Sequence, residues 1–414
     1  MVPAATARRD TTPVLAGIVT AVVGSSSSFV VVLAGLAAVG ATPAEAASGL
    51  LSVFVTQALG MLWLSVRHRR PITLAWSTPG AALLVSTGTV EGGWPAAVGA
   101  FVVTAGLILL TGLIPWLGEL ISRIPASLAR AMLAGVLLPI CLAPVTGMAD
   151  SPYLVGPVVL AWLLMHPVSR RWAVPVSLAV ALVVVVADAG SSVSASDLLP
   201  TVAWTTPTWT LPAVVSIAVP LFIVTMASQN VPGVAITASF GYEVPWRETM
   251  AVTGLGTLAG APFGGHAINL AAITAALAAG PAAGPDRSRR WIACVSAACT
   301  YLVLALASGA LAALVAAGPG DVIEAAAGLA LLGTLGAALT GALGDEDGRE
   351  AAVVCFLVAA SGITILGIGA AFWALLAGLV LRPVLAADRG SRLRQLRRPR
   401  GDQPDRVGGR IGDR

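Results

Sequence analysis

The chain has 414 residues, of which 57% are hydrophobic and only 11% are charged. Soluble domains carry about 25% charged residues, so this composition excludes an ordinary soluble protein and indicates a chain that faces lipid. All basic residues are arginine. The absence of lysine excludes a phosphate-binding glycine loop, and with it ATP-driven transport by this chain alone.

A membrane-spanning helix needs about 20 apolar residues, and apolar runs of this kind recur along the whole chain. They predict an all-α polytopic membrane protein with about 14 transmembrane segments. In chain order the expected segments are 13–40, 46–66, 72–87, 94–114, 125–147, 151–167, 172–188, 212–238, 247–262, 266–280, 290–316, 321–342, 350–366 and 368–386. The third and tenth are short and interrupted by proline or glycine.

The positions of the arginines predict the orientation. If the N-terminus is cytoplasmic, every arginine falls on the cytoplasmic side, including Arg67, Arg170, Arg247 and those from Arg382 onward. Cytoplasmic loops of membrane proteins are enriched in basic residues. We therefore expect a multi-pass protein of the bacterial inner membrane with both termini cytoplasmic, ending in a disordered tail, residues 389–414.

Two similar stretches occupy matching positions in the two halves of the chain. Ile72–Thr78 reads ITLAWST and Ile268–Thr274 reads INLAAIT. Each lies in the third segment of a seven-segment half, and an odd number of segments inverts the second half relative to the first. The pattern predicts two inverted repeats, residues 12–200 and 201–388, an architecture of many secondary transporters.

Segment 3 contains a helix start in the middle of a membrane span. Ser77, Thr78, Pro79 and Gly80 combine a capping hydroxyl with a proline in the first helical turn, so Ile72–Trp76 is expected to be extended. Free N–H groups at such a start favour anions. The alternative is that Pro79 only kinks a continuous helix.

Segment 10 has the same features. Gly264 and Gly265 precede His266, Asn269 is the expected cap, and a half-helix is expected to continue to Gly280. Inverted-repeat transporters bind substrate near the bilayer midplane, between broken helices of this kind. We therefore expect the substrate site between segments 3 and 10.

Other polar residues inside apolar segments are further candidates. Gln229 and Asn230 in segment 8 are costly in lipid unless they pair with each other, with the bundle or with a ligand. Among the four serines of segment 1, Ser25 and Ser28 are candidates, although small-residue packing explains a serine run equally well. His266 is the proton-coupling candidate because histidine can change charge near neutral pH; a neutral hydrogen-bonding role is the alternative.

Three motifs carry a resemblance to a known family: ITLAWSTPGA at 72–81, SQNVPG at 228–233 and APFGGHAINLAAITA at 261–275. Over about residues 12–386 the chain resembles the benzoate membrane transport protein family, BenE, a family of benzoate/proton symporters. The resemblance implies a fold like that of uracil and xanthine permeases. It also implies a core of segments 1–4 and 8–11 and a gate of segments 5–7 and 12–14.

The nucleobase permeases place glutamates in segments 8 and 10, where this chain has Gln229 and Ile268. A carboxylate there would repel an anionic substrate, so its absence fits benzoate or a similar aromatic carboxylate. We expect the site to comprise Ser25, Ser28, Trp76, Ser77, Thr78, Pro79, Gly80, Gln229, Asn230, His266, Ile268 and Asn269, with the ring against Trp76, Phe29 or Phe263.

The predicted function is proton-coupled symport of an aromatic carboxylate, with a nucleobase permease of the same fold or an anion channel as alternatives. The expected partners are this solute, a proton and the lipid bilayer, with a homodimer as the oligomeric state to test. The four cysteines lie in apolar runs without metal-ligand spacing. We therefore expect no enzyme activity, metal, cofactor or nucleic acid.

Overall fold

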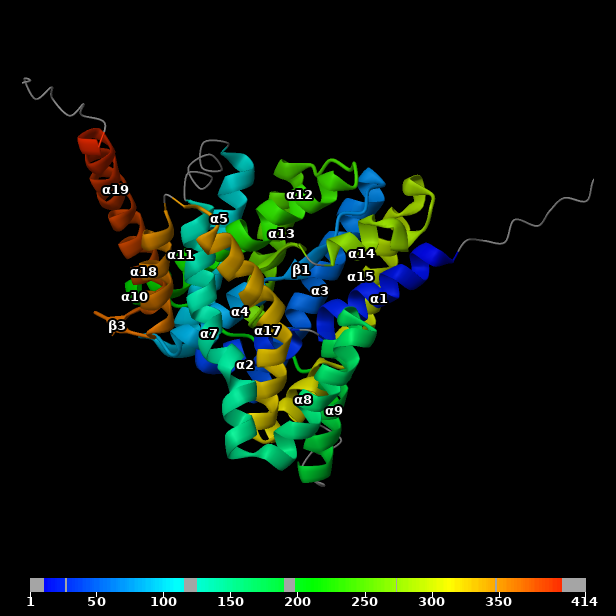
Figure 1. Ribbon diagram of the computed structural model, residues 1–414. Helices are drawn as coiled ribbons and strands as arrows, with labels where there is room; N and C mark the ends of the chain where they lie inside the picture. The colour runs from blue at the N-terminus through cyan, green and yellow to red at the C-terminus, as the bar shows by residue number, and fades with distance from the viewer. Residues whose placement is uncertain are drawn as a thin grey trace, which may run out of the picture.

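The computed structural model describes residues 11–26, 28–114, 125–189, 198–272, 274–346 and 348–396. The first half of the chain forms a bundle of helices with one short strand (Figure 1). Its elements are α1 (Thr12–Ser26), α2 (Phe29–Ala38), α3 (Pro43–His68), β1 (Leu74–Trp76), α4 (Thr78–Thr87), α5 (Gly93–Leu113), α7 (Ala126–Asp150), α8 (Pro152–Val168) and α9 (Arg170–Ala189).

The second half repeats this mixture of long helices and one interrupted span. Its elements are α10 (Leu211–Ala213), η2 (Val214–Ala218), α11 (Val219–Thr225), η3 (Met226–Asn230), α12 (Val231–Ser239), α13 (Trp246–Gly260), η4 (Ala261–Phe263), β2 (Ile268–Leu270), α14 (Ala275–Ala279), η5 (Pro281–Ala283), η6 (Arg287–Arg289), α15 (Trp291–Ala305), α16 (Ser308–Ala317), α17 (Gly320–Leu343), α18 (Arg349–Ala360), β3 (Thr364–Ile365), β4 (Ile368–Gly369) and α19 (Ala370–Leu396).

Seven helical stretches among the described residues are long and apolar enough to cross a membrane. An eighth results if α15 and α16, which meet at a bend of 56°, form one span. The chain is therefore a polytopic helical membrane protein. Length and composition support seven or eight crossings, fewer than the fourteen predicted. Two of the other predicted segments are interrupted, and several, such as α8, α13 and α18, are helices of fewer than 18 residues.

The two interrupted segments meet in the middle of the bundle, where β1 is visible in Figure 1. β1 pairs with β2 in antiparallel register, Leu74 opposite Leu270 and Trp76 opposite Ile268. Backbone groups at membrane depth must be hydrogen-bonded, and this ladder satisfies them where neither segment is helical. The predicted extended conformation before Ser77 is confirmed at residues 74–76.

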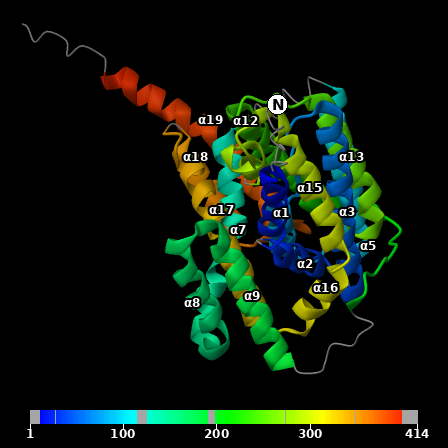
Figure 2. The same ribbon diagram turned by 90° about the vertical axis from the view of Figure 1, so that its right-hand side faces the viewer.

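The helices pack in two groups. In the first, α1 packs on α15, α15 on α3, and both α3 and α5 on α13. In the second, α7 contacts α17 and α18, α8 packs on α9, and α18 packs on α19. Both views show α8 and α9 at one end of the bundle, with α19 extending from the other (Figures 1 and 2). The site described below lies where these groups face each other.

The final helix is longer than predicted. α19 continues to Leu396, so the prediction of disorder from residue 389 is wrong for its first residues. Arg392, Leu393, Arg394 and Gln395 all have high helix propensity, which favours continuation of the helix. Residues 397–414, and Ser27 and Ile273 within the motifs, lie outside the described residues.

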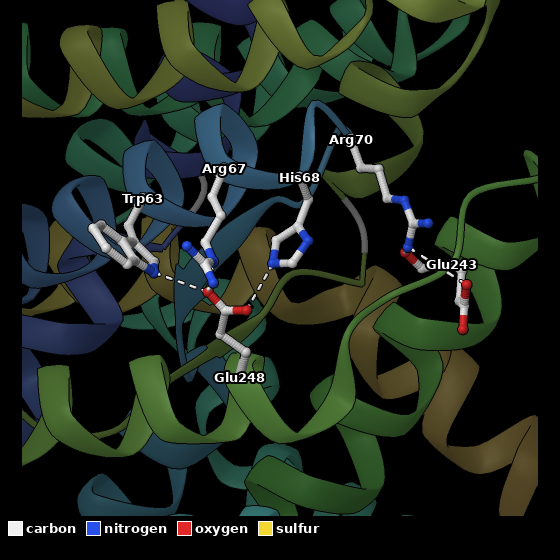
Figure 3. A network of polar contacts seen from close by, with 6 residues as sticks. All are labelled: Trp63, Arg67, His68, Arg70, Glu243 and Glu248. Carbon is white, nitrogen blue, oxygen red and sulfur yellow. Dashed lines mark hydrogen bonds and ion pairs between the residues drawn. The ribbon is translucent and has the colours of Figure 1, made fainter.

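A carboxylate joins α3 to α13 at one end of the bundle (Figure 3). Glu248 accepts hydrogen bonds from Trp63 Nε1 at 3.0 Å and His68 Nε2 at 2.8 Å. It also pairs with Arg67 Nε at 3.0 Å. Its side chain is 28% exposed, so water only partly screens these contacts.

Replacing Glu248 with alanine is expected to lower the thermal unfolding temperature of the detergent-solubilised protein. The reason is that three donors lose one shared acceptor, and charge-assisted hydrogen bonds contribute about 1.5–3 kcal/mol when buried. Glu243→Ala is the matched control, because Glu243 pairs with Arg70 at 3.6 Å while 85% exposed, and exposed pairs contribute about 0–1 kcal/mol. Equal shifts in the two variants would contradict the prediction.

Candidate functional site

The start of α4 is a helix N-terminus inside the bundle. Ser77 is its cap, and the Ser77 Oγ accepts a hydrogen bond from the Gly80 N–H at 3.1 Å, with Pro79 in the first turn. The Ser77 Oγ also contacts Thr225 Oγ1 at 2.9 Å. Gly80 allows close packing, since a Cβ there would lie 2.3 Å from Leu221 Cδ1. The predicted cap is confirmed. The Ser77 hydroxyl is already hydrogen-bonded within the protein.

The N–H of Thr78 has no hydrogen-bond partner among the described residues. It is the first N–H of a ten-residue helix, where the aligned peptide dipoles leave partial positive charge. Thr78 also carries a hydroxyl, and the residue is partly exposed. This helix start therefore offers a hydrogen-bond donor inside the bundle.

The prediction that Asn269 caps a half-helix is wrong. Asn269 lies within β2 opposite Ala75, and the helix that follows, α14, begins only at Ala275 and has five residues. Pairing with β1 keeps residues 268–270 extended. The Asn269 amide, oriented so that both polar atoms are satisfied, accepts from the Ser77 N–H at 3.1 Å and donates to the Leu270 carbonyl at 2.8 Å. Asn269 therefore braces the start of α4.

A cavity of about 520 Å³ opens between the two helix groups, a volume typical of small-molecule sites. On one side the lining comes from α1, α3 and α15 of the first group, together with β1, α4, η3 and α14. On the other side it comes from α8, α9 and α17 of the second group. Its lining residues include no aspartate or glutamate. Of the predicted site residues, the cavity is lined by Ser28, Trp76, Thr78, Pro79 and Gln229.

Gln229 reaches this cavity from an irregular stretch of helix. It lies in η3, a π-helical turn between α11 and α12. Such π-bulges shift the register of a helix and are frequent at functional sites. Trp76 enters from β1, and its indole Nε1 donates to Ser28 Oγ at 2.9 Å. The N–H edge of the indole is thereby fixed at Ser28, the residue before α2, while Trp76 borders the cavity.

The remaining predicted residues lie behind the cavity wall. Asn230 accepts from the Leu270 N–H at 2.9 Å, and Ser25 donates to the Ala21 carbonyl at 2.7 Å. The N–H of Ile268 donates to Thr257 Oγ1 at 3.1 Å. Each of these three hydrogen bonds involves a backbone group of the bundle, and none of the three residues lines the cavity. Phe29 and Phe263, the other aromatic candidates, are also absent from the lining.

His266 is buried behind the start of α4, with 1% of its surface exposed. Its Nε2 donates to the Ser77 carbonyl oxygen at 3.1 Å, and its Nδ1 is buried without a partner. This arrangement suits a neutral ring, because a protonated ring would bury a second donor without an acceptor. His266 does not line the cavity.

Three polar residues that were not among the predicted site residues also line the cavity. They are Gln57 on α3, Thr274 before α14, and Tyr301 on α15, which are 1%, 7% and 1% exposed. Gln57 is the one amide side chain of α3, and an amide inside a predicted membrane span is the signal that also drew attention to Gln229. Its position alone could have identified it as a candidate.

Basic residues form the edge of the cavity on the second helix group. Arg170 and Arg171 begin α9, and His166 ends α8. Neither arginine has a carboxylate partner among the described residues. Arginine in the first turn of a helix opposes the helix dipole, so α9 gains no stability from this pair. Their charge is free to attract an anion to the opening.

A family model described as benzoate membrane transport protein, BenE, matches residues 7–384. The chain belongs to this family. The chain is also similar to two curated proteins. "Inner membrane protein YdcO" of Escherichia coli K12 is 40% identical over 91% of this chain and 96% of its own length. "Benzoate membrane transport protein" of Acinetobacter baylyi is 28% identical over 83% and 87%.

Solved transporter structures share the fold of this BenE family member. SLC26A9 aligns with a TM-score of 0.61 and 14% identity over 91% of this chain and 66% of that chain. The transmembrane domain of a cyanobacterium bicarbonate transporter, BicA, aligns with a TM-score of 0.53 and 14% identity over 91% and 97%. At such low identity the likeness concerns the fold alone. The chain is thus a membrane transporter of the benzoate transport family.

Proposed function

We propose that this protein is a secondary active transporter that moves benzoate or a similar aromatic carboxylate together with a proton. The observation that carries the proposal is the start of α4, with its unpaired Thr78 N–H, at the wall of a largely apolar cavity. One end of that cavity suits a carboxylate, and the rest suits an aromatic ring.

The carboxylate would lie at the start of α4. The Thr78 N–H and hydroxyl supply donors, and the helix dipole adds about 0.3–1 kcal/mol, rising to about 2 kcal/mol in partly buried sites. Gln229 offers a further donor from η3. Because no acidic side chain lines the cavity, nothing in it repels the negative charge.

The ring would lie against Trp76, whose indole is fixed by Ser28. Phe54 supports this surface from behind, with its ring 4.9 Å from that of Trp76 and 6.1 Å from that of Tyr301. Offset and edge-to-face aromatic contacts contribute about 0.5–1.5 kcal/mol beyond the area buried. A flat aromatic acid therefore makes favourable contacts through both its carboxylate and its ring.

We further propose that the fourteen segments form two inverted seven-segment repeats. The first helix group would be the core, segments 1–4 and 8–11, and the second the gate, segments 5–7 and 12–14. The packing of the helices supports this division, as does the antiparallel meeting of β1 and β2 from the two halves. Movement of the core against the gate would then expose the cavity to each side in turn.

Proton coupling follows from the charge of the substrate. An anion that enters a cell works against the inside-negative potential, about 2.3 kcal/mol per charge per 100 mV. One cotransported proton cancels that charge. The arginine pattern supports cytoplasmic termini in an inner membrane, so that Arg170 and Arg171 would border a cytoplasmic opening. The homodimer stays a prediction.

The role of His266 in coupling is a prediction that His266→Gln tests. Glutamine can keep the hydrogen bond to the Ser77 carbonyl but cannot carry the proton. If His266 couples transport, the variant keeps benzoate exchange and loses accumulation driven by an acidic exterior. Unchanged accumulation would assign His266 only to bracing the start of α4.

Competition for uptake of labelled benzoate by reconstituted vesicles tests the substrate class. We expect unlabelled aromatic carboxylates to compete, and uracil, xanthine and bicarbonate not to. Bicarbonate is included because the fold is shared with a bicarbonate transporter. Strong competition by bicarbonate would favour a small-anion transporter or channel, and competition by uracil would favour a nucleobase permease.

A further inference from the structure

The cavity contains a second polar region besides the start of α4. Gln57, Thr274 and Tyr301 all line it and are at least nine-tenths buried. Gln57 Oε1 and Thr274 Oγ1 have no hydrogen-bond partner. Neither the Gln57 amide nor the Tyr301 hydroxyl bonds to any described residue.

The three residues come from three elements that line the same cavity: α3, the turn before α14, and α15. A Cβ built on Gly24 of α1 would lie 2.8 Å from the Tyr301 hydroxyl and 3.0 Å from the Thr274 methyl carbon, so these two side chains approach the same point of α1. The Tyr301 ring also lies 6.1 Å from that of Phe54, one turn before Gln57 on α3. Tyr301 thus lies between Thr274 and the part of α3 that carries Gln57.

Unpaired buried polar groups lower the stability of the folded protein. A buried donor or acceptor without a partner costs about 1–3 kcal/mol, whereas leucine at position 57 would carry no such cost. Native proteins leave few buried polar groups unsatisfied. A ligand group that completes their hydrogen bonds accounts for their presence in a wall that is otherwise apolar.

We propose that this second polar region binds a hydroxyl group on the ring of the substrate, so that the preferred substrates are hydroxylated aromatic carboxylates. This inference rests on the proposed function, since the carboxylate occupies the start of α4. A hydroxyl both donates and accepts, so it can pair with either end of the Gln57 amide. The Tyr301 and Thr274 hydroxyls offer it further partners.

Selectivity measured in vesicles tests this inference. The KM for uptake is determined for benzoate and for 2-, 3- and 4-hydroxybenzoate. The wild-type protein is expected to have a lower KM for at least one hydroxylated isomer than for benzoate. Gln57→Leu is expected to raise the ratio of hydroxybenzoate KM to benzoate KM about tenfold, the effect of about 1.4 kcal/mol. Thr274→Val and Tyr301→Phe are expected to raise the same ratio.

Two controls separate ligand binding from structure. Thr104→Val removes a buried hydroxyl that bonds to the Ala100 carbonyl on α5, outside the cavity, and is expected to leave the ratio unchanged. Gln57→Leu is also expected to keep or raise the thermal unfolding temperature, because it removes an unpaired group.

Each remaining outcome overturns the inference. An unchanged ratio in Gln57→Leu, with benzoate still transported by the wild type, rejects the hydroxyl site and leaves the proposed function intact. Equal loss for benzoate and hydroxybenzoate assigns Gln57 to the carboxylate instead. Failure of the wild type to transport any of these acids rejects both proposals together.

Discussion

Replacing Gln229 with glutamate is expected to weaken benzoate binding about a hundredfold at neutral pH. The two side chains have the same shape, and Gln229 is only partly buried in the cavity wall, so the variant should fold. At an effective dielectric constant of about 20, two like charges about 6 Å apart repel by about 2.8 kcal/mol, which corresponds to a hundredfold change in affinity.

The measurement is the benzoate Kd of the purified protein, determined at several pH values. Binding to Gln229→Glu should recover as the pH falls, because protonation of the new carboxyl removes the repulsion. Gln229→Met is the matched control, which loses the amide without gaining charge and should weaken binding far less. If glutamate at 229 binds benzoate as tightly as glutamine does, the carboxylate does not lie near η3.

Replacing Gly333 with tryptophan is expected to abolish transport. Gly333 lines the cavity from α17, and a Cβ there meets nothing within 4 Å. A tryptophan side chain therefore has room to enter the space reserved for the substrate ring, and its large surface would fill much of it. Helix propensity also rises on replacing glycine, so the fold should persist.

Gly336 provides the control for this substitution. It lies one turn later on α17, and a Cβ there also meets nothing within 4 Å, but it is not among the residues that line the cavity. Gly336→Trp should transport as the wild type does, with both variants reconstituted at equal amounts. Normal uptake by Gly333→Trp would show that the solute follows a different path.

Local patterns predicted the start of α4 because its determinants are adjacent in the chain. Ser77 as cap and Pro79 in the first turn define a helix start by themselves. Asn269 has the same local appearance, yet its role depends on Ala75, which lies opposite it in another strand. A ladder between segments so distant in the chain is not visible in either segment alone.

The residues of the cavity wall show the same limit of prediction from local sequence. Trp76, Thr78 and Gln229 belong to recognisable motifs, and all three line the cavity. Gln57 and Tyr301 belong to none of these motifs, and only the packing of α3 and α15 brings them to the site. Family resemblance identified the transporter class, but not which buried polar residues face the solute.

The central claim is most directly tested by the rate of benzoate uptake into vesicles that contain only this protein and lipid. With an acidic exterior and no membrane potential, the initial rate of uptake should exceed that of protein-free vesicles, in which only undissociated benzoic acid crosses the lipid, and a protonophore should abolish the accumulation. Equal initial rates in vesicles with and without the protein, under the same pH gradient, would contradict proton-coupled transport of an aromatic carboxylate.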